Sequence, residues 1–319
     1  ARSKKKFLFW YKFFILIRLL NLVTYLIISI SANSQSEYIY ILGNTQDAGL
    51  PHIGCQHPFC EDSFNAYEEH YATSIAVVNS DLKKYILFEA TPDITFQLNN
   101  LKKNIFDEFL LPESIYITHA HIGHYTGLMY FGREALGAKD LIVKVLPRMS
   151  NFLQNNGPWS QLVDINNIKI KELNFESSTD ELKNISVTPV QVPHRDEYSE
   201  TAGYIIKGKN KKALFIPDID KWEKWDRDLS KLVKEFDFLL IDATFYDSKE
   251  INRDISEIPH PLVTETIDLL SGLDLKNRNK VYFIHMNHTN MMLNPDSDLS
   301  KLVTSKGFNI ARLGQKLYL

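Results

Sequence analysis

The chain has 319 residues, of which 44% are hydrophobic and 24% are charged, and its formal net charge is −3. This composition allows a sizeable buried core and excludes wholesale disorder, a collagen-like repeat and a disulfide-rich scaffold. The chain has only two cysteines, Cys55 and Cys60, and it has ten histidines, most of which fall into three tight clusters.

The first 36 residues differ from the rest in charge. They contain no acidic residue, and an apolar run from Leu19 to Ile30 is followed by small residues. Their basic residues are Arg2, Lys4, Lys5, Lys6, Lys12 and Arg18. This order is typical of a secretory signal peptide, and the last two of these charges interrupt the stretch that a membrane span would need. We expect residues 1–36 to be a cleaved signal peptide or an N-terminal anchor, and the body of the protein to be exported, periplasmic or extracellular.

Without this segment the chain is clearly acidic. Six of the 36 Lys and Arg residues lie in the segment, which leaves 30 basic residues against 39 acidic ones and a net charge near −9. A polyanionic partner such as nucleic acid is therefore not expected. We expect a small-molecule substrate and contact with a membrane only through the N-terminal segment; a homodimer is compatible with the sequence.

From residue 37 onward, short β-rich runs alternate with helical patterns, which favours an α/β layered fold. The predicted strands are Tyr38–Leu42, Thr73–Asn79, Tyr85–Glu89, Ser114–Thr118, Leu141–Leu146, Ile185–Val192, Ala202–Lys207, Ala213–Pro217, Phe238–Asp242 and Val281–His285. The predicted helices are Ile94–Lys102, Thr126–Leu136, Trp222–Phe236 and Leu262–Leu270. The aromatic stripe of the third helix has helical spacing and is interpreted as core.

The segment from 149 to 183 is polar and rich in Asn, and its periodicity is weak. We interpret it as an insertion or a lid. No linker rich in Pro or Gly divides the body, so we expect residues 37–319 to form one domain.

Three histidines directly follow one predicted strand, as His119, His121 and His124 after Ser114–Thr118. In a turn after a strand, the first two can point to one side and share a metal, while His124 begins the next helix. A single His in such a place is usually a polar loop residue. Three imidazoles at this spacing favour a metal site, because uncompensated rings would repel one another when protonated.

Three later strands also end in a possible ligand, namely His194, Asp218 and His285. Taken alone each is unremarkable, and an Asp after a strand is more often a turn or a helix cap. Four strands that each end in His or Asp predict one metal site along an edge of a sheet.

The order His-x-His-x-x-His, His, Asp, His resembles the metallo-β-lactamase superfamily, from roughly Tyr38 to the C-terminus. Within it, the chain is most similar to the group that contains the pyrroloquinoline-quinone biosynthesis B protein and the cyclic-phosphate phosphodiesterase of carbon–phosphorus lyase pathways. The resemblance implies an α/β (α+β) fold, the four-layer αββα sandwich, with a hydrolytic centre of one or two metals.

The same resemblance implies a role for each residue of the centre. His119, His121 and His194 would hold the first metal. Asp218 would bridge the two metals, and His124 and His285 would belong to the second. The expected metal is zinc, with iron or manganese as alternatives at this centre.

The chain departs from the family pattern at Gly123. The pattern is His-x-His-x-Asp-His, and glycine stands here in place of the Asp. The second metal is therefore expected to lack a carboxylate, which weakens that site or favours a different metal. A mononuclear centre, or a role other than hydrolysis, becomes more credible.

The two cysteines lie in the pattern Cys55-x-His57-x-x-Cys60. In an exported chain they could form a disulfide. The relatives that the chain resembles carry a structural zinc at this place, with a His three residues after the last histidine of the centre as the fourth ligand. The resemblance thus implies a structural zinc held by Cys55, His57, Cys60 and His288.

Further residues are candidates for supporting roles. A Thr-Phe…His unit, Thr244 to His260, resembles one that places a catalytic acid in the phosphodiesterase branch, although His260 could equally be an N-terminal helix residue. Glu89 falls where the superfamily usually has an Asp that supports a metal-bound His. The supporting carboxylates we expect are Glu89, Asp93 and Asp242, with Asp47 as a further candidate.

Three functions are consistent with this pattern. The first is an exported metal-dependent hydrolase of ester, phosphodiester or lactone-like bonds, in which Asp218 and His260 take part in catalysis. The second, implied by the biosynthesis resemblance, is a metal-dependent oxidative step on a quinone precursor with iron at the centre. The third is a non-catalytic metal-binding relative. Fold alone does not decide between them.

Overall fold

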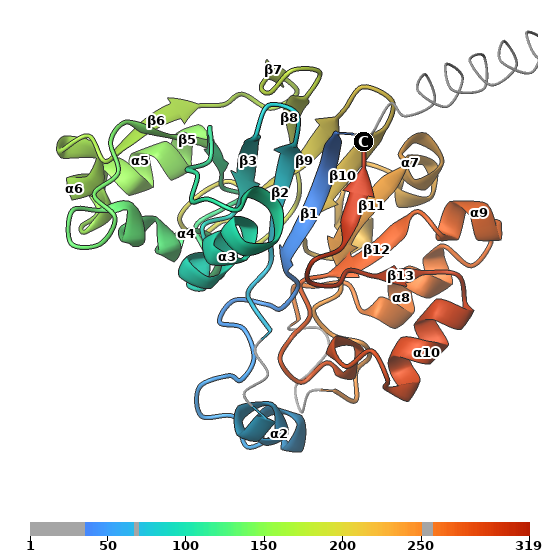
Figure 1. Ribbon diagram of the computed structural model, residues 1–319. Coiled ribbons are helices and arrows are strands. Elements are labelled where there is room, and N and C mark those ends of the chain that lie inside the picture. Colours follow the sequence, from blue (N-terminus) through green and yellow to red (C-terminus); the bar gives the residue numbers. More distant parts are fainter. Residues whose placement is uncertain (1–35, 67–69, 251–257) are drawn as a thin grey trace, which may run out of the picture. The chain divides into compact units, whose positions relative to one another are not determined.

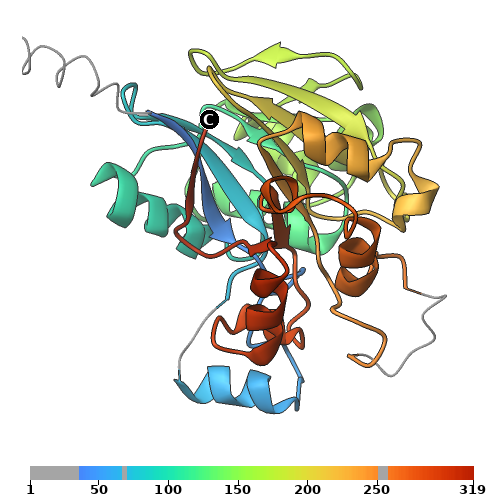
Figure 2. The same ribbon diagram turned by 90° about the vertical axis from the view of Figure 1, so that its right-hand side faces the viewer.

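The computed structural model describes residues 36–66, 70–250 and 258–319, all of which belong to one compact unit, Ser36–Leu319. The predicted signal peptide or anchor lies outside the described residues. Two seven-stranded sheets face each other (Figures 1 and 2). The first has the order β14 (Lys316–Tyr318), β1 (Glu37–Gly43), β2 (Ser74–Asn79), β3 (Lys84–Phe88), β4 (Ile115–Tyr116), β5 (Leu141–Val145) and β6 (Ile168–Glu172). The second has the order β13 (Asn309–Ile310), β12 (Val281–Ile284), β11 (Phe238–Asp242), β10 (Lys212–Ile216), β9 (Ala202–Lys207), β8 (Ser186–Gln191) and β7 (Thr179–Asp180).

Helices cover the outer faces of both sheets. The helices on the first sheet are α3 (Ile94–Leu101), α5 (Pro147–Asn155) and α6 (Trp159–Asp164). The helices on the second are α7 (Leu229–Glu235), α8 (Val263–Leu269) and α10 (Asp298–Ser305). Short α4 (Ile122–Tyr125) and α9 (Leu275–Arg278) lie in connections, and α2 (Pro58–Ala66) projects from the end of the sandwich at the bottom of Figure 1.

Apolar side chains alternate between the two faces of the strands, so the sandwich contains three apolar cores. In β1, Ile39 and Ile41 face the second sheet, while Tyr38, Tyr40 and Leu42 face the helices of the first sheet. Such alternation follows from the two-residue period of a strand, and each buried Ile or Leu contributes roughly 1.5–3 kcal/mol. One core between the sheets and one under each helical layer confirm the predicted four-layer αββα sandwich.

Strand directions bring many strand ends to one edge. In the first sheet β1 and β3 are each antiparallel to β2, and β4 is parallel to β3, so β1, β3 and β4 all end at the same edge. In the second sheet β8, β10, β11 and β12 also share one direction, because β9 is antiparallel to both of its neighbours. The carboxyl ends of parallel strands are the usual place for a site in such sheets.

The ten strands predicted from the sequence are present, and so are the helices at 94–102 and 262–270. Thr126–Leu136 differs, since only Thr126–Phe131 is helical, and it is a 3-10 helix. The segment 149–183, predicted as an insertion or lid, contains regular elements. It supplies α5, α6 and the edge strand β6, which pairs in parallel with β5. The edge strand β6 is missing from the predicted strands, although Ile168 and Ile170 alternate with Lys169 and Lys171 along it.

The predicted helix Trp222–Phe236 is wrong as one continuous element. A 3-10 turn covers Trp222–Lys224, the chain is extended at Trp225, and α7 begins only after Asp228. Asp228 starts the new helix because its Oδ1 accepts hydrogen bonds from Ser230 N at 2.9 Å and Lys231 N at 3.3 Å. Both tryptophans are nonetheless buried in the core under the helices, as their spacing indicates.

Among residues 36–66, 70–250 and 258–319, no helix has the length and apolar character that crossing a membrane requires.

The cap at Asp228 makes a testable contribution to stability. We expect Asp228→Ala to lower the free energy of unfolding by about 1 kcal/mol, because two helix N–H groups lose their acceptor. Urea unfolding followed by circular dichroism measures the change. Asp226→Ala, at an exposed position two residues earlier, is the control. A loss for Asp228→Ala no larger than that of the control would contradict this role.

Candidate metal centre

Three histidines and one aspartate converge at the carboxyl ends of β4, β8 and β10. His119 Nε2 lies 2.8 Å from His121 Nδ1, and His194 Nε2 lies 3.2 Å from that same Nδ1. Asp218 Oδ2 lies 3.4 Å from His119 Nε2 and 3.3 Å from His194 Nε2. One ligand atom from each of the four residues thus falls within 4.8 Å of all the others. This is the arrangement predicted for the first metal.

The remaining ring nitrogens of two of these histidines are fixed from outside. Thr118 Oγ1 lies 2.9 Å from His119 Nδ1, and Glu197 Oε2 lies 3.0 Å from His121 Nε2. Such partners orient metal ligands and set their tautomers. Glu197 was not found by sequence reasoning, since an acidic residue in an irregular loop carries no motif.

A second group joins His124 in α4 and His285 after β12 with Asp47 in the loop after β1. One ligand atom of each residue lies within 4.8 Å of the others. His124 Nε2 is also 3.8 Å from Asp218 Oδ2, so Asp218 lies between the two groups, as a bridging residue must. Asp47 had been expected only as a supporting carboxylate, and the structure places it among the possible ligands.

Glu89 supports His124 from the opposite side. Its Oε1 lies 3.3 Å from His124 Nδ1, and its Oε2 accepts a hydrogen bond from Thr118 N. Burial lowers the pKa of His124, but Glu89 and Asp218 outweigh burial and raise it to about 9. The fully buried Glu89 therefore lies where a carboxylate can support His124.

Beside both groups, His260 contacts two carboxylates. Its Nδ1 lies 2.8 Å from Asp242 Oδ2 and 3.2 Å from Asp218 Oδ1. Thr244 donates its hydroxyl to Asp242 Oδ1 at 2.7 Å. Burial lowers the pKa of His260, but Asp242 and Asp218 outweigh it and raise that pKa to about 10. The structure thus brings His260 and Asp242 next to Asp218, and their catalytic and supporting roles stay predictions.

The chemistry of the donor set fits a metal ion. His124 Nε2 and His285 Nε2 are buried and have no hydrogen-bond partner. Leaving such atoms unpaired costs roughly 1–3 kcal/mol each, and a cation would satisfy them. Burial also holds the pKa of His119 and His285 well below the usual value, so both rings are neutral, the form that binds metal. His194 and His260 outweigh the effect of burial on Asp218 and hold its pKa well below the usual range.

The cysteine cluster is a separate group. Cys55, Cys60 and His288 have ligand atoms within 4.8 Å of one another, and both thiols are free. Burial, helped by the nearby His52 and His57, lowers the pKa of His288 to about 4, which keeps it neutral. A disulfide is thus not formed in the structure.

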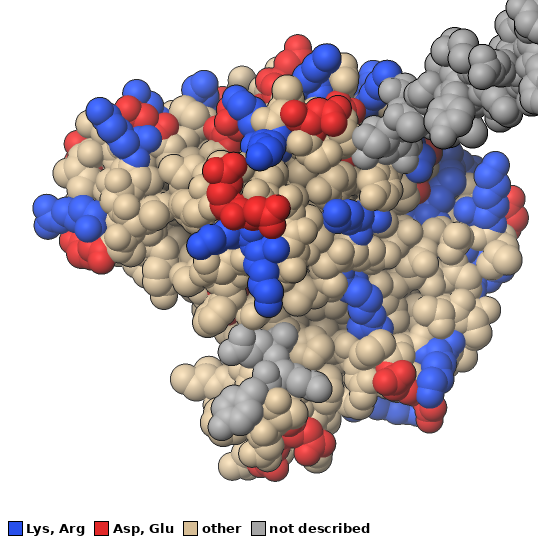
Figure 3. Space-filling model, viewed as in Figure 1, with Lys and Arg blue, Asp and Glu red and all other residues tan. Residues whose placement is uncertain are grey.

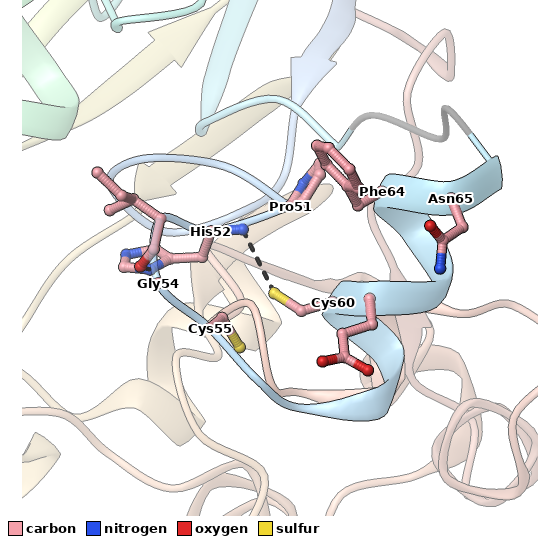
Figure 4. Close-up of a pocket in the computed structure, with 9 residues that line it drawn as sticks. Pro51, His52, Gly54, Cys55, Cys60, Phe64 and Asn65 are labelled. Carbon is pink, nitrogen blue, oxygen red and sulfur yellow. Dashed lines mark hydrogen bonds between the residues drawn. The ribbon is translucent and has the colours of Figure 1, made fainter.

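His57, the fourth predicted ligand, is not part of this group. It directly precedes α2, and its Nδ1 accepts a hydrogen bond from Phe59 N at 3.3 Å, which turns that nitrogen to the helix start. His52 lies next to the cysteine group instead, and its ring stacks on the His288 ring at a centroid distance of 4.0 Å. A cavity of about 650 Å³ adjoins the two cysteines, between the loop that carries Cys55 and the first turns of α2 (Figure 4).

Asp93 stands at the start of α3, and its Oδ2 accepts a hydrogen bond from Ala72 N at 2.7 Å. It therefore holds the chain that leads into β2, and its supporting role at the centre stays a prediction.

Comparison with known proteins identifies the family. A family model described as a beta-lactamase superfamily domain matches residues 84–286, which is more than half of the chain. The chain belongs to the β-lactamase superfamily. The matched range contains every histidine of the two His-rich groups, together with Glu89, Asp218 and Asp242.

Relatives within the superfamily agree with the group predicted from the motifs. Curated proteins called Coenzyme PQQ synthesis protein B are 24% identical in Methylobacillus flagellatus and 26% identical in Methylococcus capsulatus. Each match covers 88% of this chain and 100% or 99% of the relative.

Solved structures show the same fold. Zn²⁺-bound PqqB from Methylobacterium extorquens has a TM-score of 0.73 at 20% identity, over 88% of this chain and 100% of that one. A diphosphatase from the PhnP family has a TM-score of 0.61 at 21% identity, over 88% and 96% of the two chains. The predicted resemblance to this group of the β-lactamase superfamily is therefore confirmed.

The cysteine group can be tested separately from the His-rich centre. We expect Cys60→Ser to lose about one zinc per chain and to lower the midpoint of thermal unfolding, because a thiolate ligand is removed. His57→Ala should keep that zinc, since His57 lies outside the group. Metal analysis after dialysis and a thermal melt measure both effects. An equal loss of zinc in His57→Ala would show that His57 is a ligand.

Proposed function

We propose that this member of the β-lactamase superfamily is a metal-dependent hydrolase of an ester, phosphodiester or lactone-like bond. The observation that carries the proposal is the pair of His-rich groups joined by Asp218, with His260 beside them. His119, His121, His194 and Asp218 would hold one cation, and His124 and His285 would contribute to a second. A cation bound there supplies a charge that polarises the scissile group and lowers the pKa of a coordinated water.

His260 is the residue of the chain best suited to give a proton to the leaving group. Its Nδ1 is engaged by Asp242, which leaves Nε2 for a substrate atom. The raised pKa keeps the ring protonated near neutral pH, as a general acid requires. Asp242 is itself held by Thr244 and by Ile219 N, so it fixes the orientation of the ring.

Three aromatic residues pack together, and two of them directly follow residues of the centre along the chain. Tyr125 directly follows His124, and Tyr198 directly follows Glu197, whose carboxylate contacts His121. Phe152 packs against both tyrosines, at centroid distances of 5.3 Å and 5.7 Å. Basic and acidic side chains are interspersed over the described residues on the face in Figure 3, which gives no support to a polyanionic partner.

A second candidate is a metal-dependent oxidative step in the synthesis of a quinone cofactor. The observation in its favour is that relatives named for coenzyme PQQ synthesis match 88% of this chain along their whole length. Metal analysis of the protein as isolated separates the two. Iron at the His-rich centre, with consumption of dioxygen in the presence of a quinone precursor, would favour oxidation, whereas zinc with turnover of a phosphodiester would favour hydrolysis. Bound metal without either activity would indicate a non-catalytic metal-binding protein.

We further propose that residues 1–36 direct the protein out of the cytoplasm. The support is their six basic residues, the apolar run from Leu19 to Ile30 and the small residues Ser29, Ser31 and Ala32 at its end. Mass spectrometry of the protein isolated from its own host should find either a chain that starts shortly after Ala32 or an intact chain in the membrane fraction. An intact chain in the cytosolic fraction would contradict export.

The role of His260 gives the most specific test of hydrolysis. Using bis(p-nitrophenyl) phosphate, we expect His260→Gln to lower kcat by about 10²- to 10⁴-fold, because the leaving group loses its acid. The loss should be larger for a diester with an alkyl leaving group than for the aryl diester, since a poorer leaving group needs the proton more. A merely structural role would lower both rates equally. His70→Gln, at a histidine outside the His-rich groups, serves as the control. Absence of phosphodiester turnover by the metal-loaded wild-type protein would contradict the proposed hydrolase function.

A further inference from the structure

Gly123 creates a space that the aspartate from another loop fills. A Cβ built at position 123 would lie 2.5 Å from Asp47 Cα and 2.8 Å from Asp47 Oδ1. Real Cβ atoms do not approach so closely, so any side chain at 123 would displace Asp47. The superfamily pattern has an Asp at this point of the motif, and the Asp47 carboxylate lies where that side chain would begin.

The Asp47 carboxylate also lies beside the two histidines of the second group. One of its oxygens is within 4.8 Å of the ligand nitrogens of both His124 and His285. Those histidines are 1% and 0% exposed, and Nε2 of each has no hydrogen-bond partner. Two unpaired, buried nitrogens and a carboxylate that face one another form a ligand set for a divalent cation.

Backbone hydrogen bonds fix the loop that carries Asp47. Gln46 N donates to Met286 O at 2.7 Å, and Met286 N donates to Asn44 O at 2.8 Å, so this loop pairs with the residue after His285. Asp47 has a φ of 41°, a left-handed conformation that Asp tolerates better than most residues. The loop is thus built to hold this side chain against His285.

We infer that Asp47 supplies the carboxylate that Gly123 lacks, and that the His-rich centre binds two cations. The second cation is held by Asp47, His124 and His285 together with the shared Asp218, an inference that rests on the proposed function of the centre as a metal site. Position 123 must then be glycine, because any side chain there would displace the Asp47 carboxylate that serves as the ligand. Glycine at 123 therefore does not imply a weakened or mononuclear centre, because the loop after β1 supplies the carboxylate through Asp47.

Metal binding by the full chain tests this assignment without reference to turnover. Wild-type protein dialysed against zinc should bind about three equivalents, two at the His-rich centre and one at the cysteine group. We expect Asp47→Asn to lower the affinity for the most weakly bound zinc by about 10- to 100-fold or more. A loss of this size follows even when only a residue that hydrogen-bonds to a metal ligand is removed. Cobalt substitution identifies which site is lost, because only the cysteine group gives a thiolate charge-transfer band. Asp81→Asn, in the exposed turn between β2 and β3, is the matched control.

An exchange of the two positions provides the decisive variant. Gly123→Asp alone should also lose the second cation, since its side chain displaces Asp47. The double variant Asp47→Gly/Gly123→Asp should regain it, because the carboxylate returns from the position of the family motif. Unchanged stoichiometry and affinity in Asp47→Asn would overturn the assignment. If Asp47→Asn does not fold, recovery of the second cation by the double variant upholds the assignment and its absence overturns it. Loss of the second cation in a protein without hydrolase activity would uphold the ligand and refute the proposed function.

Discussion

One buried carboxylate, Asp218, sets the charge requirement of the centre. It is 3% exposed, and an uncompensated buried carboxylate costs several kcal/mol. His119, His194 and His260 approach it at 3.2 to 3.4 Å. Burial keeps His119 neutral, so the ring atoms offer lone pairs more readily than protons. A cation held by this carboxylate together with His119 and His194 would satisfy these three groups, while His260 contacts the carboxylates of Asp218 and Asp242 directly. Such a cation would let the chain bury these polar groups where the strands end.

The sequence predicts much of this centre because parallel strands deliver their following residues to one edge. His119, His194, Asp218 and His285 each come directly after a strand that its β-branched and aromatic residues reveal. Glu197 could not be found in this way, since it stands in an irregular loop and only the fold brings it to His121. His57 lies outside the cysteine group for a related reason. Its spacing suits a zinc ligand, but its Nδ1 accepts a hydrogen bond at the start of α2, and spacing does not show where a ring nitrogen points.

The carboxylate of the second group shows a different limit of sequence reasoning. A motif assigns each ligand to a position along one loop, so glycine at 123 is interpreted as a lost ligand. The three-dimensional requirement is only that an oxygen reaches His124 and His285, and any neighbouring loop can meet it. Asp47 meets it because β1 and β4 run in the same direction, so that the loop after β1 and the segment after β4 that carries His124 lie at the same end of the sheet. The pairing of positions 47 and 123 is a matter of steric exclusion, which no pattern within either loop records.

The loop after β1 also links the two kinds of metal-binding group. It carries Asp47 and, further on, Cys55, while the facing loop carries His285 and His288. The two loops are thus joined at the Asp47 group, at the cysteine group and by the backbone pair of Gln46 and Met286. If both groups hold metal as proposed, each cross-link limits the freedom of the other, and loss of the cysteine metal should loosen the second cation of the His-rich centre. The effect is partial, because the backbone pair remains. The affinity for the first cation should not change when the cysteine metal is lost, since the ligands of the first cation follow β4, β8 and β10 and lie on neither loop.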